Sequence, residues 1–159
     1  MSALLVEAGA EHFAALIAGE VPPDALSLAP SELAPVPVIE MLADLSARIG
    51  ASHVPNAWII VEQGCVAGLL TLVCEPAERG ATIGYGVAES HRGRGLASGA
   101  VRELLALLRH DPRVDAVLAE TSTENPASQH VLRVNGFAET GQRTDPEDGP
   151  LICWRKTLA

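Results

Sequence analysis

A glycine-arginine turn before a long amphipathic segment is the clearest candidate for chemistry in this sequence. The turn reads Arg92-Gly93-Arg94-Gly95 and follows an apolar, strand-like run at residues 83–88. Apolar residues then recur at helical spacing, which predicts a helix with one face toward a core. The first N–H groups of a helix lack partners within it and carry partial positive charge. We therefore interpret the turn as a cradle for phosphate or pyrophosphate, with both arginines available for charge-assisted hydrogen bonds.

Two other interpretations of this turn are open at the level of sequence. The arginines could form a solvated basic turn that binds nothing. Alternatively, Gly93 and Gly95 could open a dinucleotide-binding fold, but no third glycine follows at the required spacing. The strands expected before the turn also form an antiparallel meander, whereas that fold begins with a βαβ unit. The paired glycines at a helix start favour the anion site.

Composition limits the class of protein. The chain has 159 residues, 48% hydrophobic and 19% charged, which predicts one globular domain over residues 1–159. Its net charge of −9 argues against a nucleic-acid partner, because such proteins need basic surface to neutralise phosphates. The longest apolar run, residues 65–74, is too short to span a bilayer, and the first residues do not resemble a secretory signal. We expect a cytoplasmic protein without a membrane partner, and a homodimer is left open.

The cysteines and histidines do not follow the spacing of a metal site. Cys65, Cys74 and Cys153 are odd in number and far apart, so we expect reduced thiols. The five histidines are scattered, and His91, just before the turn, is expected at the surface. The sequence therefore predicts no bound metal.

The rest of the chain predicts the elements that must hold the turn in place. Expected strands cover residues 4–7, 57–62, 66–73, 81–88, 114–121, 137–143 and 151–157. Expected helices cover residues 10–18 and 38–49, run from 96 to before Pro112, and run from 126 to 134 between Asn125-Pro126 and Asn135-Gly136. The proline-rich segment (residues 22–37) is expected to be a long loop or to hold a short helical turn. An antiparallel meander joined to a βαβ unit implies an α+β fold with a mixed sheet and helices on its faces.

Two motifs of the sequence, one at the glycine-arginine turn and one at the last expected helix, resemble those of a known family. The run Arg92-Gly93-Arg94-Gly95-Leu96-Ala97 matches the R/Q-x-x-G-x-G/A motif of the GNAT superfamily of acyl-CoA-dependent N-acyltransferases. The run Glu124-Asn125-Pro126-Ala127-Ser128, followed by Asn135-Gly136-Phe137, resembles the ENPAS…GF signature of its RimJ/RimL-type branch. The resemblance covers roughly residues 57–157. It implies a GNAT-like αβα sandwich around a mostly antiparallel sheet; residues 1–56, which match no motif, would shape the acceptor site.

The resemblance also implies where acyl-CoA binds. In this family the strands before and after the long helix splay apart, and the pantetheine arm lies in the gap. Carried across, the arm would contact Gly86, Val87 and Ala88. The pyrophosphate would lie against Arg92, Gly93, Arg94, Gly95, Leu96 and Ala97. Asn125 is expected mainly to cap the following helix, and contact with the cofactor would be its secondary role.

The implied reaction is transfer of the acetyl group of acetyl-CoA to a primary amine by direct attack. The acceptor would be a protein or peptide N-terminus or a small-molecule amine. Glu120 ends an apolar strand where some family members have a catalytic glutamate. Partial burial would raise its pKa and let it take the amine proton, directly or through water. A solvated glutamate at a strand end is an equally good interpretation.

The proton for the leaving thiolate needs a second group. Many family members use a tyrosine where this chain has Leu132. The resemblance suggests Ser128 in that role, against the alternative of an ordinary hydroxyl in a first helical turn. Tyr85 is an alternative acid, although strand packing is favoured for it. Because the tyrosine is missing, a non-catalytic acyl-CoA-binding sensor or interaction domain is the alternative function.

Overall fold

A mixed sheet of eight strands forms the centre of the computed structural model, which describes residues 4–158. The strands are β1 (Leu4–Glu7), β2 (Ser27–Leu28), β3 (Ala57–Glu62), β4 (Cys65–Leu72), β5 (Gly80–Val87), β6 (Ala116–Ser122), β7 (Ala138–Asp145) and β8 (Gly149–Thr157). The helices are α1 (Ala10–Ala18), α2 (Val36–Ile49), α3 (Leu96–Leu108) and α4 (Pro126–Val134), with a 3₁₀ turn, η1 (Glu89–His91). The predicted α+β class is confirmed, and the predicted element order is confirmed apart from the additional strand β2 and the turn η1.

The strand order, β1-β3-β4-β5-β6-β8-β7, places β5 and β6 side by side in the middle of the sheet. They pair in parallel, but only Gly80–Ile83 of β5 pairs with Ala116–Ala119 of β6. Beyond Ile83, β5 continues along β4, and beyond Ala119, β6 continues along β8. The two strands therefore separate at their carboxyl ends, as the resemblance implied.

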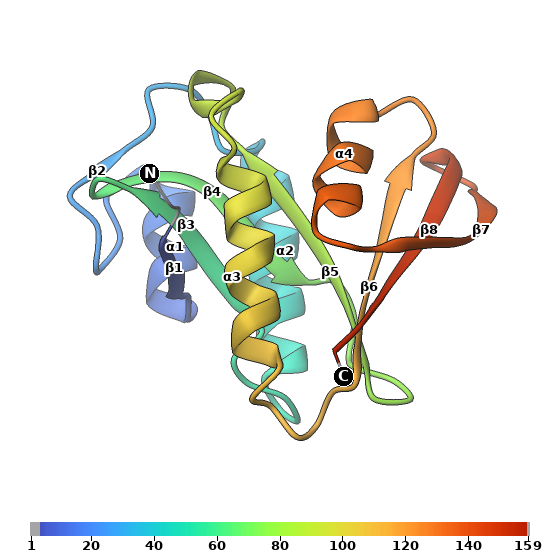
Figure 1. The fold of residues 1–159 in the computed structure, drawn as a ribbon. Coiled ribbons are helices and arrows are strands. Elements are labelled where there is room, and N and C mark those ends of the chain that lie inside the picture. Colours follow the sequence, from blue (N-terminus) through green and yellow to red (C-terminus); the bar gives the residue numbers. More distant parts are fainter. Residues whose placement is uncertain (1–3, 159) are drawn as a thin grey trace.

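Helices cover both faces of the sheet (Figure 1): α3 and α4 lie on one face, and α1 and α2 lie on the other. The alternation of side chains along the strands explains the two layers. Ile60 and Leu70 share a buried cluster with the apolar face of α3, whereas Ile59 and Val66 share a second one with α1. Because β3 and β4 are buried on both faces, they read as nearly continuous apolar runs.

The proline-rich segment is more ordered than expected. It contains the two-residue strand β2, which pairs with β4, and α2 begins at Val36, before the expected start at residue 38. Pro37 lies in the first turn of α2, where a missing N–H breaks no helical hydrogen bond. Strand ends elsewhere differ from expectation by one or two residues.

None of the described helices is both long enough and apolar enough to cross a membrane.

Candidate functional site

A cavity of about 530 Å³ lies where β5, the start of α3 and the start of α4 meet. Its walls come from the end of β5, from the glycine-arginine turn with the first turn of α3, and from the first turns of α4. The two elements that the sequence analysis singled out, the turn and the helix after Asn125, therefore face one another across a single space.

The glycine-arginine turn has the backbone expected of a cradle. Gly93 and Gly95 have φ of 76° and 74°, a region that side chains with a Cβ rarely adopt. A Cβ at either position would meet no atom within 4 Å, so the backbone is open to a ligand there. Gly95 is the N-cap of α3, and Leu96, Ala97 and Ser98 of its first turn line the cavity. The first N–H groups of a helix have no helical acceptor, so this wall suits an anion.

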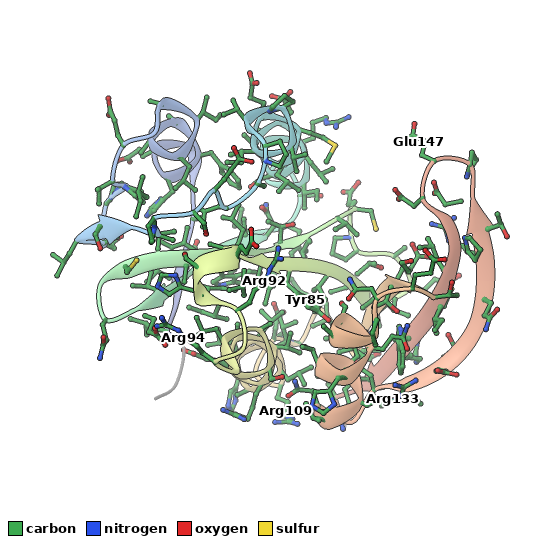
Figure 2. The ribbon with its side chains drawn as sticks, turned by 90° about the horizontal axis from the view of Figure 1, so that it is seen from above. Tyr85, Arg92, Arg94, Arg109, Arg133 and Glu147 are labelled. Atoms are coloured by element: carbon green, nitrogen blue, oxygen red, sulfur yellow. The ribbon has the colours of Figure 1, made fainter. Side chains whose placement is uncertain are left out.

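The two arginines of the turn differ in placement. Arg92 lines the cavity, and its Nε donates to the Val87 carbonyl at 3.2 Å. The Nη1 of Arg94 instead lies 2.9 Å from Oε1 of Glu62, a carboxylate that is only 7% exposed. In the view of Figure 2, Arg92 projects nearer to Tyr85 than Arg94 does, and both Arg92 and Tyr85 line the cavity. The expected phosphate contact is therefore not supported for the Arg94 side chain, because the buried carboxylate needs a partner and takes this guanidinium.

The strand residues expected along the pantetheine arm are also divided. Gly86 and Val87 line the cavity, in the part of β5 that has left β6. Ala88 is fully buried, and its N–H donates to the Ala67 carbonyl at 2.7 Å. The Ala88 N–H is therefore already paired within the protein, and a contact between Ala88 and the pantetheine arm stays a prediction.

Two hydroxyl groups meet in the cavity wall. The Tyr85 hydroxyl lies 3.0 Å from Oγ of Ser128 and 3.1 Å from the Ser128 carbonyl oxygen. Burial raises the pKa of Tyr85, so its hydroxyl keeps its proton at neutral pH. The sequence favoured strand packing for Tyr85. It does pack against the core, and it also presents its hydroxyl to α4. The alternation Ile83, Tyr85, Val87 along β5 was the signal that could have placed it on this face.

Asn125 caps α4 as predicted: its Oδ1 accepts a hydrogen bond from the Ser128 N–H at 3.1 Å. It also lines the cavity. The cap orients the first turn of α4 and so places Ser128 opposite Tyr85.

Glu120 lies on β6 outside the described residues that line the cavity. Its carboxylate forms a two-point ion pair with Arg143 of β7, with Nη2 2.7 Å from Oε1 and Nε bonded to Oε2. The Sγ of Cys153 also lies 3.7 Å from Oε2. The Arg143 hydrogen bonds lower the pKa of Glu120 more than burial raises it. The expected raised pKa is therefore wrong, since a guanidinium 23 residues along the chain compensates the loss of solvent.

Other cavity residues were missed. His91 was expected at the surface, yet it is 9% exposed and lines the cavity, and His130 of α4 lines it as well. A lone histidine beside a motif carries no sequence signal for burial, which depends on how neighbouring elements pack over it. Among residues 4–158, no group of three or more His, Cys, Asp and Glu side chains is arranged to hold a metal ion.

Comparison with known proteins identifies the family of this chain. The family described as the acetyltransferase (GNAT) domain matches residues 5–138. Comparison with curated proteins finds no matching sequence.

Among solved structures, the chain resembles RimL, a ribosomal L7/L12 alpha-N-protein acetyltransferase in complex with coenzyme A. The TM-score is 0.71, the identity 21%, and the match covers 99% of this chain and 94% of that one. It also resembles a chimera of the spermidine N-acetyltransferase SpeG from Vibrio cholerae and hSSAT (TM-score 0.73, 17% identity, 99% and 96% covered). A third similar structure is AAC(6')-Ib with ribostamycin and coenzyme A (TM-score 0.69, 19% identity, 99% and 94% covered).

These structures share the fold, and the family match spans most of the sequence. The chain belongs to the GNAT acetyltransferase family and, by that membership, is an acetyl-CoA-dependent acyltransferase.

Proposed function

We propose that this protein transfers the acetyl group of acetyl-CoA to a primary amine by direct attack of the amine on the thioester. The acceptor is a protein or peptide N-terminus or a small-molecule amine. One observation carries the proposal: the cavity lies between the N-terminus of α3, the part of β5 that β6 does not pair and the first turns of α4, and Tyr85 and Ser128 meet in its wall. Its volume, about 530 Å³, falls within the range of roughly 300–1,000 Å³ typical of small-molecule sites.

The residues present fit coenzyme A. The open backbone at Gly93 and Gly95 and the N–H groups at the start of α3 would bind the pyrophosphate, with Arg92 adding a charge-assisted hydrogen bond. The edge of β5 at Gly86 and Val87, which β6 does not pair, would bind the amides of the pantetheine arm. Asn125 would contact the coenzyme from the opposite wall.

Acetyl-CoA supplies an activated carbonyl carbon, and the attacking amine displaces sulfur with the electron pair of the carbon–sulfur bond. The amine nitrogen loses one proton and the sulfur gains one. We propose that the Ser128 hydroxyl donates the proton that the sulfur gains. The Ser128 oxygen can in turn accept a hydrogen bond from the Tyr85 hydroxyl. Because burial raises its pKa above the ordinary tyrosine value, Tyr85 keeps its proton at neutral pH.

Glu120 is our candidate for the group that takes the amine proton. Its lowered pKa makes it an ionised acceptor at neutral pH but a weaker base than expected. Since it lies outside the cavity wall, on β6 beyond the paired region, it would act from the other side of the gap, through water.

Release of free coenzyme A thiol tests the function. We expect thiol release above the background rate when acetyl-CoA is mixed with the protein and one member of an amine panel: spermidine, ribostamycin and a peptide with a free N-terminus. Mass spectrometry of the amine should show one added acetyl group. Saturable binding of coenzyme A without turnover on any amine would instead support the sensor alternative.

A further inference from the structure

A chain of three polar side chains runs from the proline-rich segment to the cavity. Oγ of Ser31 accepts a hydrogen bond from the Ser90 N–H at 2.8 Å and donates one to the Ser90 Oγ at 2.9 Å. Oγ of Ser90 lies 3.0 Å from Nδ1 of His91. Ser31 and Ser90 are 59 residues apart in the sequence, so only the tertiary structure brings them together.

The hydrogen bonds between these three side chains all donate in one direction, from Ser31 toward His91. Because the Ser31 hydroxyl proton goes to Ser90, the Ser90 hydroxyl proton is available for Nδ1 of His91. In the neutral imidazole that accepts at Nδ1, the ring proton lies on Nε2. His91 is buried and forms part of the cavity wall. The three side chains therefore hold one ring orientation in that wall and link it to the proline-rich segment.

The position of that segment matters because two substrates must share one gap. The cavity is walled by α3 and α4, on one face of the sheet. With the coenzyme on this face, the proposed function leaves the other face for the approach of the amine to the gap. Figure 1 shows α2, and the segment that leads into it, on that other face. Backbone hydrogen bonds from Leu26, Ser27 and Ala29 hold the first half of the segment to Gly64 and Val66. Ser31 then joins the next stretch to η1, directly beside the cavity.

We propose that the Ser31–Ser90–His91 chain positions the proline-rich segment according to occupancy of the cavity. Ser31 is then a positioning residue for the amine acceptor, acting through His91 without touching the coenzyme. The inference rests on the proposed function, because it takes the cavity as the coenzyme site. A coenzyme that fixes the ring of His91 would, through these hydrogen bonds, also stabilise the bound position of Ser31.

Hydrogen exchange on the full chain tests the coupling without any acceptor. We expect saturating coenzyme A to slow amide exchange across residues 26–35 in the wild-type protein. Ser31→Ala should lose this slowing while its affinity for coenzyme A stays within about twofold, since one neutral hydrogen bond at a distance is removed. Ser31→Thr keeps a hydroxyl and should retain the effect. Ser27→Ala, an exposed serine of β2, is the matched control.

Steady-state kinetics with the best amine of the panel gives the second readout. Ser31→Ala should raise the KM for the amine by about fivefold and leave kcat and the KM for acetyl-CoA within about twofold. If Ser31→Ala does not fold, Ser90→Ala breaks the same chain and should give the same split. Slowing of exchange that persists in Ser31→Ala, or an unchanged KM for the amine, overturns the proposal. If the wild-type protein acetylates no amine, the proposed function fails. The exchange experiment still decides whether the Ser31–Ser90–His91 hydrogen bonds couple the cavity to the proline-rich segment.

Discussion

The hydroxyl of Tyr85, on β5, lies 3.0 Å from Oγ of Ser128, on α4, across 43 residues of sequence. The two side chains come from different walls of the cavity in which we propose that the thiolate forms. The Asn125 cap holds the backbone of Ser128, and burial keeps Tyr85 protonated. Together they can supply the acid that the missing tyrosine at Leu132 leaves unassigned.

If the two hydroxyls act as one unit, their substitutions should not be additive. We expect Ser128→Ala to lower kcat by about 100-fold and Tyr85→Phe by about tenfold, because a positioned acid contributes roughly that range. The double variant should lose little more than Ser128→Ala alone. Thiol release measures turnover, and titration should show coenzyme A affinity close to that of wild type. Full activity in Ser128→Ala would remove the serine from the mechanism.

The two arginines of the turn should separate binding from stability. Arg92→Ala should weaken coenzyme A affinity by about tenfold, since it removes one charge-assisted contact. Arg94→Ala should leave affinity nearly unchanged and lower the free energy of unfolding by about 1–2 kcal/mol, because it leaves the buried Glu62 carboxylate unpaired. Calorimetric titration and denaturant unfolding measure the two effects. Adding Glu62→Gln to Arg94→Ala should restore part of the lost stability, whereas equal loss of affinity in both arginine variants would contradict the assignment.

The pH dependence of turnover tests Glu120. Arg143 lowers the pKa of this carboxylate, so Arg143→Ala should raise that pKa and keep Glu120 protonated to higher pH. The acid limb of the kcat/KM profile should therefore move to higher pH. Glu120→Gln should bind coenzyme A normally and lose turnover. Arg109→Ala, at the end of α3, serves as the control, and a limb that stays in place in Arg143→Ala would exclude Glu120 as the base.

Two groups near the ends of α2 and α3 should make the fold sensitive to acid. The Arg113 hydrogen bonds lower the pKa of Asp111 from 3.8 to about 2. This stabilisation is present above the unfolded pKa of 3.8 and is lost as the pH falls toward about 2. Allowing for solvent screening, it amounts to about 1–2 kcal/mol. Burial lowers the pKa of His53 as well, so the unfolded chain binds a proton first, and stability falls as the pH drops below 6.5.

Unfolding by urea at a series of pH values measures both effects. Asp111→Asn should flatten the loss of stability between pH 3.8 and about 2, and His53→Gln should flatten the loss just below pH 6.5. Asp148→Asn, in the exposed β7–β8 turn, should leave the curve unchanged. Identical curves for wild type and Asp111→Asn would show that the ion pair with Arg113 contributes nothing.

Local features of the fold and site were predictable from the sequence. The glycines of the turn, the apolar stripe of α3 and the Asn125 cap each depend on residues within one or two helical turns. The order of helices and strands follows likewise from the spacing of apolar residues and from the turn residues that interrupt it. The separation of β5 and β6, in contrast, was expected only from the family resemblance, because the pattern of apolar residues in a strand does not show where its pairing stops.

Contacts between distant side chains were decided by the tertiary structure. Arg94 was expected to face a phosphate and instead pairs with Glu62, and the pKa of Glu120 falls because β8 and β7 bring Arg143 beside it. His91 is buried, and Ser31 of the proline-rich segment forms hydrogen bonds to the neighbouring Ser90 of η1. Each outcome depends on strand register and helix placement over more than 20 residues of chain. The sequence by itself determined the glycine-arginine turn, because backbone conformation and the helix dipole act within a few residues.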